Sequence, residues 1–330
     1  MPEESEAHER TFMQWPVNRD VHSDAVFLNM LQTSIAQVAN TISEFEPVTM
    51  LMDIKHRASA QRKLGRRVKI YDIPTDDLWC RDAGPLFVKN GKGELAIAHI
   101  KFNGWGNKQI HSHDGRIAER VAKRMGVPLI DSHLTGEGGG VETDGDGTLI
   151  AHESCWVNRN RNSVDRVTIG RRLKRALGAT KIIWAPGIKG ADITDDHIDA
   201  LARFVRPGLI AIQLPEKPEK NDPWSLSAFK TYNILRKARD AKGRPLKLVK
   251  LPSPRRTRVA SDDFFASYAN YYVCNGAVIA AQFGDRKADA KARSTLQGLY
   301  PDREIIMLNV DPIGEIGGGI HCATQQQPKV

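Results

Sequence analysis

The sequence is poor in the features that mark several specialised classes of protein. It has only four cysteines among 330 residues, and no two of them form a Cys-x-x-Cys pair. This spacing argues against a zinc knuckle, a thioredoxin-type redox site and a disulfide-stabilised miniprotein. An uncharged run at residues 271–284 is too short and too polar to cross a bilayer, which takes roughly 20 apolar residues. The pattern predicts a soluble globular protein.

The chain also lacks a low-complexity or Pro/Gly/Ser-rich linker that would divide it. Its length allows two domains of roughly 100–200 residues each, but without such a linker we expect one domain over residues 1–330. Residues 1–6 are acidic and do not follow the basic, apolar and small-residue order of a signal peptide. This predicts a cytoplasmic protein, with export after removal of a leader as the alternative.

The positive charge of the chain is concentrated in one segment. The net charge is +9, and residues 216–258 hold thirteen basic residues against four acidic ones, so the rest of the chain is neutral. Charge alone supports nucleic-acid binding through residues 217–258 as an alternative function, although no nucleic-acid motif accompanies it. A helix beginning after Asp222 is expected there, because one apolar stripe recurs at helical spacing. We expect this basic segment on the outer face, with a core-facing stripe made of Trp224, Ala228, Tyr232 and Leu235.

Short apolar runs alternate with helical patterns along the chain, which predicts an α/β fold. Asn275-Gly276 indicates a hairpin within residues 266–281. Helices are expected at 25–43, 116–125 and 165–177. Strands are expected at 47–52, 68–71, 86–88, 95–98, 148–150, 181–184 and 246–251.

Cys322 is the first candidate for chemistry, because it follows three consecutive glycines and His321. Glycines let a backbone pass close to a ligand and adopt conformations that other residues avoid. Such an approach can expose a nucleophilic thiol, while a buried cysteine in a tight turn is the alternative.

His197 and Asp199 are the second candidates. Residues two apart on an extended segment point to the same side, so this carboxylate can orient the imidazole or bind a cationic substrate with it. A solvated acidic loop before a helix at 200–205 is one alternative. A metal site is the other, and residues 111–114 (His-Ser-His-Asp) have suitable side chains but no recognised metal-ligand spacing.

Two further carboxylates lie in unusual surroundings. Asp82 follows Arg81 between a tryptophan and Gly84-Pro85, and an Arg81–Asp82 ion pair at a turn is the simpler interpretation. Glu137 lies in a glycine-rich stretch, but an acid there repels phosphate, so we reject nucleotide binding. A thiol, an imidazole, several carboxylates and a tryptophan together suit attack on the carbon of a bound guanidinium group.

A set of motifs is distributed in order over the whole chain, at residues 1–4, 8–16, 78–85, 137–139, 144–148, 153–155, 158–162, 197–199, 267–270, 283–285 and 317–322. In these motifs the chain resembles the agmatine deiminase and bacterial peptidylarginine deiminase family. The resemblance implies a pentein fold, a five-bladed α/β propeller with pseudo-fivefold symmetry and a central active site that uses no metal or cofactor. The spacing of Asp82, Glu137, His197, Asn270 and Cys322 suits five modules that each contribute one residue.

The same resemblance implies the reaction and the roles of the residues. Agmatine and water would give N-carbamoylputrescine and ammonia through a covalent thiouronium-type intermediate. Cys322 would attack the guanidine carbon and His197 would act as acid and base. Asp82 and Asp199 would hold the guanidinium group, and Trp79 would line the pocket.

The remaining implications are less specific. Glu137 would lie beside the guanidinium or behind Arg81, and Gly318 would contact substrate. The expected partner is a small guanidine rather than nucleic acid or membrane, and a homodimer is compatible with this. Peptidylarginine deimination to citrulline and amidinotransfer on the same fold remain alternatives. The chain departs from the family pattern at Asp196, where glycine is usual, and at 280–281, where proline is usual.

Overall fold

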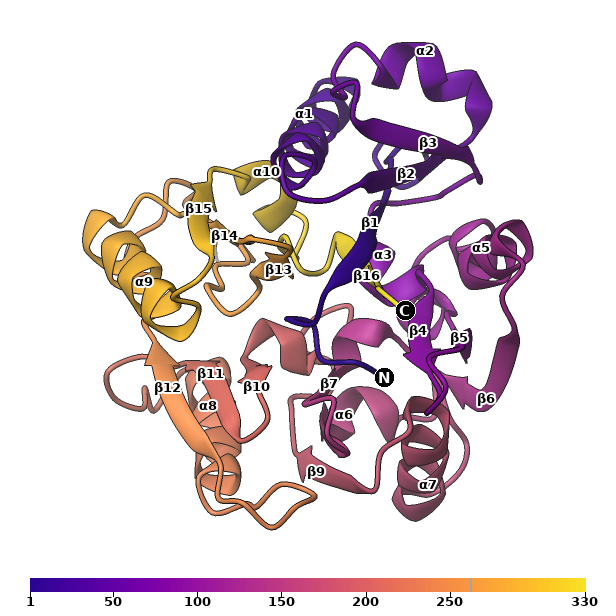
Figure 1. Cartoon of the computed structure of the whole chain (residues 1–330). Helices are drawn as coiled ribbons and strands as arrows, with labels where there is room; N and C mark the ends of the chain where they lie inside the picture. Colours follow the sequence, from indigo (N-terminus) through magenta and orange to yellow (C-terminus); the bar gives the residue numbers. More distant parts are fainter. Residues whose placement is uncertain (262) are drawn as a thin grey trace.

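The computed structural model describes residues 1–261 and 263–330, and within them it confirms an α/β fold with five separate β-sheets. Figure 1 shows the sheets and their helices arranged around the middle of the molecule. One sheet has four strands in the order β16-β1-β2-β3 and so joins the two ends of the chain. Its strands are β16 (Thr324–Pro328), β1 (His8–Gln14), β2 (Val48–Met52) and β3 (Val68–Asp72).

The other four sheets have three strands each, taken in chain order. They are β4 (Leu86–Lys89), β5 (Leu95–Lys101) and β6 (Leu129–Thr135); β7 (Val141–Thr143), β8 (Thr148–His152) and β9 (Lys181–Ala185); β10 (Ala202–Arg206), β11 (Leu209–Gln213) and β12 (Lys247–Leu251); and β13 (Tyr272–Cys274), β14 (Ala277–Ala281) and β15 (Glu304–Leu308).

One pairing pattern recurs in all five sheets. An antiparallel pair, such as β4 with β5 or β16 with β1, is followed by a parallel strand. The parallel strand is reached through a helix, as such a connection requires. The five crossover helices are α1 (Ala25–Ile42), α5 (Ile117–Met125), α7 (Arg166–Leu177), α8 (Pro223–Leu235) and α9 (Arg286–Leu299).

The helices begin and end where their sequences predict. The Asp24 carboxylate accepts hydrogen bonds from the first turn of α1, and Asp165 caps α7 in the same way. Gly178 ends α7 with a φ of 71°, a conformation that favours glycine. The hairpin at Asn275-Gly276 is confirmed as β13 and β14. Every strand predicted from the sequence is present with bounds within one or two residues, apart from β5, which extends to Lys101.

Two local predictions are wrong. The helix expected at 200–205 is a 3₁₀ turn, η4 (Ile198–Ala200), followed by strand β10, because this stretch pairs with β11 in the core. In α8, Trp224 is 44% exposed, while Ala228 and Leu235 are buried as expected. Ser225 and Thr231 are also buried on the inner side of α8, so its core-facing stripe is more polar than predicted.

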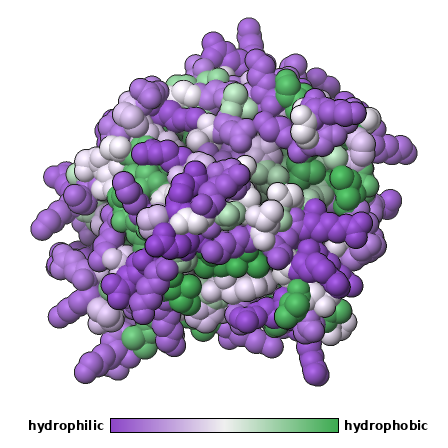
Figure 2. Space-filling model, turned by 60° about the horizontal axis from the view of Figure 1, so that its bottom comes forward, coloured by the Kyte–Doolittle hydropathy of each residue, from purple (hydrophilic) through white to green (hydrophobic). Residues whose placement is uncertain are grey.

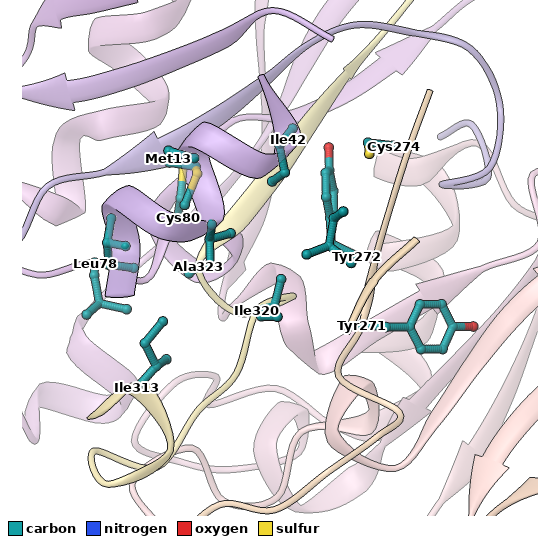
Figure 3. Packing of buried hydrophobic residues seen from close by; sticks show 14 of the residues in the cluster. Met13, Ile42, Leu78, Cys80, Tyr271, Tyr272, Cys274, Ile313, Ile320 and Ala323 are labelled. Carbon is teal, nitrogen blue, oxygen red and sulfur yellow. The ribbon is translucent and has the colours of Figure 1, made fainter. Parts of the chain in front are cut away.

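The hydrophobic core anchors the segments that carry the candidate residues. In Figure 3, Leu78 and Cys80 lie near Ile320 and Ala323 in one buried cluster. Leu78 and Cys80 flank Trp79 at the start of the short helix α3 (Cys80–Ala83), and Ile320 and Ala323 lie on either side of Cys322. Close packing of these neighbours restricts the backbone on both sides of the candidate residues.

The molecular surface carries no extended apolar region on the face seen in Figure 2, where green residues occur in small groups among purple ones. In the described ranges, none of the helices is both long and apolar enough to cross a membrane.

Candidate active site

The candidate residues occupy equivalent places in the five sheets. Each lies a few residues before the first strand of an antiparallel pair. Asp82 is in α3 before β4, and Glu137 begins η3 (Gly138–Gly140) before β7. Asp199 lies in η4 before β10, with His197 as the residue that precedes η4. Asn270 and Cys322 precede β13 and β16. The repeated pairing pattern therefore explains the regular spacing seen in the sequence.

A cavity of about 300 Å³ lies among these loops. Four carboxylates and two histidines line it, whereas no lysine or arginine of the described residues does. Such a lining attracts cations and disfavours anions. The lining side chains include Asp77, Asp82, Asp192, Asp199, His22, His197, Trp79, Trp105, Gly318 and Cys322.

The Cys322 thiol lies at this cavity and is held from both sides. Asn270 Nδ2 donates to Cys322 Sγ at 3.1 Å, and Asn270 Oδ1 accepts from the Cys322 backbone N–H at 3.3 Å. Asp199 Oδ2 is 3.7 Å from the sulfur. Burial and the nearby carboxylates of Asp199 and Asp82 raise the pKa of this thiol well above its usual range. The thiol therefore keeps its proton until a positive charge offsets these carboxylates.

His197 is placed to carry a proton. Its Nε2 is 3.3 Å from Glu137 Oε2, and its Nδ1 is 3.6 Å from Asp82 Oδ1. Burial lowers the pKa of an imidazole, but the carboxylates of Asp82 and Glu137 outweigh it and raise the pKa of His197 to about 9. At neutral pH this side chain is an imidazolium that can protonate a leaving group.

The two aspartates predicted to bind guanidinium both line the cavity. Asp82 accepts from Trp105 Nε1 at 2.9 Å and from the Gly139 N–H at 3.1 Å, and burial raises its pKa to about 6. Asp199 Oδ2 lies 2.7 Å from His321 Nδ1. Burial opposes ionisation of Asp199, but His321 outweighs it and lowers the pKa. Asp199 Oδ1 is buried and has no hydrogen-bond partner in the described ranges, so it is available to a bound donor.

Glu137 does not line the cavity, and it lies behind His197. Its carboxylate accepts from Arg161 Nε at 2.7 Å. The sequence suggested that Arg81 pairs with Asp82 or lies beside Glu137, and neither contact is seen. The Arg81 guanidinium instead pairs with Glu4 at 3.0 Å and with Gln326 at 2.8 Å.

The carboxylate of Asp196, the residue before His197, does not line the cavity and pairs with a buried histidine. Asp195 and Asp196 have φ angles of 63° and 69°, which cost energy for residues other than glycine. Asp196 Oδ1 lies 3.2 Å from His152 Nδ1, and Asp195 Oδ2 accepts from Arg161 Nη1 at 2.7 Å. These buried ion pairs hold the turn that precedes His197.

Gly318 and Trp79 meet at the cavity wall. A Cβ atom at Gly318 would lie 2.2 Å from a ring atom of Trp79, so only glycine permits this approach.

The sequence did not single out Trp105 or Asp77 as site residues. Asp77 Oδ1 lies 2.8 Å from His22 Nε2. Asp77 occurs in the stretch before Trp79, but nothing in its spacing indicated a role.

No group of three or more metal-ligating side chains is found in the described part of the chain. In the stretch considered as a metal site, His111 Nδ1 lies 2.9 Å from the Gln109 carbonyl oxygen. Asp114 accepts hydrogen bonds from the backbone of Asp76 and Asp77 and so stabilises the loop before Trp79.

Known proteins are similar to this chain in sequence and fold over nearly their whole length. A sequence model of the Porphyromonas-type peptidyl-arginine deiminase family matches residues 1–328. The agmatine deiminase of Pseudomonas aeruginosa is 34% identical, with 99% of this chain and 95% of that protein aligned. The agmatine deiminase of Medicago truncatula is 33% identical over 100% of this chain and 96% of its own. The structure of the Enterococcus faecalis agmatine deiminase superposes with a TM-score of 0.90 at 29% identity, covering 100% of this chain and 95% of that one. The chain belongs to the Porphyromonas-type peptidyl-arginine deiminase family.

Proposed function

We propose that this protein is a hydrolase that converts agmatine and water to N-carbamoylputrescine and ammonia, with Cys322 as the nucleophile. The observation that carries the proposal is the unpartnered Asp199 Oδ1 in a cavity lined by carboxylates, next to a thiol and an imidazolium. A guanidinium group supplies the N–H donors that this oxygen lacks. The relatives named agmatine deiminase support the choice of substrate.

The guanidinium group binds between Asp199 and Asp82, with Trp79 and Trp105 along the wall of the cavity. Pairing with carboxylates keeps the group protonated, so its carbon remains electrophilic. The bound cation also offsets the two carboxylates that raise the pKa of the Cys322 thiol. Substrate binding therefore favours release of the thiol proton to solvent and formation of the thiolate, which is the nucleophilic form of cysteine.

The reaction then proceeds in two stages on the same residues. The sulfur attacks the guanidine carbon, the His197 imidazolium gives its proton to the departing ammonia, and a thiouronium-type adduct forms. Neutral His197 next takes one proton from water, whose oxygen attacks the adduct carbon. The C–S bond then breaks, the remaining hydroxyl proton passes to the sulfur, and the ureido product leaves with Cys322 again as a thiol. Glu137 and Arg161 hold His197 from behind and contact no substrate.

The cavity favours agmatine over free arginine. Agmatine ends in a second cationic group, which suits Asp77 and Asp192, whereas the carboxylate of arginine would face these acids in a cavity whose described lining contains no lysine or arginine. A volume of about 300 Å³ suits a small substrate. The basic segment lies elsewhere, because none of residues 217–258 lines the cavity.

A side-by-side assay of three guanidines tests the assignment. We expect kcat/KM for ureido product to be at least about 100-fold higher with agmatine than with arginine, since like charges facing each other cost several kcal/mol. A blocked arginine peptide is the third substrate and tests peptidylarginine deimination. Comparable rates with arginine or the peptide would contradict the assignment, and amidino transfer to an added amine would indicate an amidinotransferase.

The pH dependence of agmatine hydrolysis tests which protonation states of Asp82 and His197 the mechanism requires. Asp82 must be ionised to bind the guanidinium, so kcat/KM should fall below pH about 6 as this carboxylate is protonated. His197 must be protonated to release ammonia, so the rate should fall again above pH about 9. A kcat/KM that rises through pH 9 would show that neutral His197 is the active form and would contradict the mechanism.

The recurrent pairing of strands supports a finer description of the fold. We propose that the five sheets are the blades of a pentein propeller with pseudo-fivefold symmetry, and that residues 1–330 form one catalytic domain. Each blade then contributes one loop to the centre, immediately before its antiparallel pair.

A further inference from the structure

A residue from the beginning of the chain is buried at the centre of the molecule. Figure 1 shows the N-terminal segment passing beside β16 near the middle. The Glu4 side chain there is 7% exposed and meets three cationic partners. Its Oε1 lies 2.9 Å from Arg203 Nη2, and its Oε2 lies 3.0 Å from Arg81 Nη2 and 2.9 Å from His321 Nε2.

His321 connects this buried carboxylate to the candidate active site. Its Nε2 faces Glu4, and its Nδ1 faces Asp199 Oδ2 at 2.7 Å. A carboxylate is an acceptor, so a histidine between two of them donates from both ring nitrogens and is an imidazolium. We call these three side chains the Glu4–His321–Asp199 relay. Neither Glu4 nor His321 lines the cavity, and both are almost completely buried.

We propose that Glu4 and His321 are positioning residues for substrate binding, acting through Asp199. Glu4 accepts from one ring nitrogen of His321 and holds the ring in one orientation. His321 then binds Asp199 Oδ2, which keeps the carboxylate ionised and leaves Oδ1 free toward the cavity. This inference rests on the proposed function, because it assigns the binding of the guanidinium to Asp199.

The electrostatics agree with this geometry. Burial opposes ionisation of both carboxylates, yet Arg203, His321 and Arg81 keep the pKa of Glu4 well below its usual range, and His321 lowers that of Asp199. Replacing His321 removes the partner that fixes the rotamer of the buried Asp199, and removing the charge of Glu4 removes the group that orients His321.

Glu4 also neutralises Arg81 and Arg203, so a purely structural role must be distinguished from positioning. The test compares Glu4→Gln, His321→Gln and the double variant, with Glu46→Gln as a matched control. Glu46 is a buried carboxylate 3.1 Å from His8 Nδ1, and it does not line the cavity. Binding is measured as the Kd for agmatine in a Cys322→Ser background, and turnover as kcat/KM with Cys322 present.

We expect Glu4→Gln and His321→Gln each to raise the Kd for agmatine and lower kcat/KM by about tenfold or more, as loss of an orienting partner commonly does. Because both act through Asp199, the double variant should resemble His321→Gln within about threefold. Glu46→Gln should keep the wild-type Kd even if its Tm falls. A folded Glu4→Gln or His321→Gln variant with wild-type Kd, or multiplicative effects in the double variant, would overturn the proposal.

A second measurement does not depend on turnover. NMR spectra of protein with ¹⁵N-labelled histidine identify the ring signals of His321 as those that disappear in His321→Gln. We expect these signals to show two protonated nitrogens at neutral pH. A neutral tautomer would overturn the relay even if Glu4→Gln fails to fold. If wild-type protein hydrolyses another guanidine instead of agmatine, the same variants are compared on that substrate. Failure of the proposed function is thereby distinguished from failure of the relay.

Discussion

Replacement of Cys322 by serine is expected to lower kcat for agmatine by at least about 10,000-fold, since loss of a covalent nucleophile removes most of the chemical acceleration. Agmatine should still bind, because Asp199, Asp82 and Trp79 keep their places. The hydroxyl of serine loses its proton far less readily than a thiol, so the bound cation does not activate it. Product formation and calorimetric binding, measured on the same preparation, separate chemistry from affinity.

Cys274→Ser is the matched control for this variant. Cys274 is fully buried, donates to the Ala277 carbonyl oxygen at 3.6 Å, and does not line the cavity. A serine there can make the same hydrogen bond, so turnover should remain close to that of the wild type. If Cys322→Ser retained even about a tenth of wild-type turnover, covalent catalysis by this thiol would be wrong.

Asp199→Asn is expected to have the second largest effect, a fall of about 1,000-fold in kcat/KM for agmatine. Removing one partner of a buried, hydrogen-bonded charge pair costs roughly 2–5 kcal/mol, most of it as lost binding. The amide also places a donor beside the guanidinium, where the carboxylate offered an acceptor, and its neutral oxygen is a weaker acceptor for the His321 ring N–H than the carboxylate was.

In the same Asp199→Asn variant, the reactivity of the Cys322 thiol should increase while turnover falls. Asp199 helps to raise the pKa of Cys322, so its neutralisation lowers that pKa and should speed alkylation of Cys322 by iodoacetamide near pH 8. Asp131→Asn changes an exposed carboxylate that does not line the cavity and should alter neither rate. An Asp199→Asn protein that keeps wild-type kcat/KM, or whose thiol reacts more slowly, would contradict the assigned roles.

The amino-acid sequence predicted much of the candidate site. Cys322, His197, Asp82 and Asp199 were selected from local surroundings, and all four line one cavity. This was possible because each lies in a short loop before an antiparallel pair, where glycines and tight turns leave a recognisable local signal. The strands of β2, β4 and β8 were likewise predicted correctly, since apolar runs that are buried in a sheet stand out in sequence.

Other predictions failed where distant residues decide the outcome. The helix expected at 200–205 is strand β10, because pairing with β11 outweighs local preference. Glu137 was expected beside the guanidinium or behind Arg81, and the second expectation is wrong, because its carboxylate pairs with Arg161 and His197 instead. A single buried carboxylate has several possible cationic partners, and only the packing of the loops selects one.

The amino-acid sequence on its own predicted the α/β class and the positions of most strands, and it selected the thiol, the imidazole and the paired carboxylates as candidates. The tertiary structure decided which carboxylate oxygen is free, how the thiol and imidazole titrate, and that Glu4 reaches the site through His321, 317 residues away in the chain. These properties depend on burial and on distances of about 3 Å between segments far apart in sequence. Local patterns carry no information about such distances, because hydrogen bonding and desolvation are determined only when the five sheets have assembled.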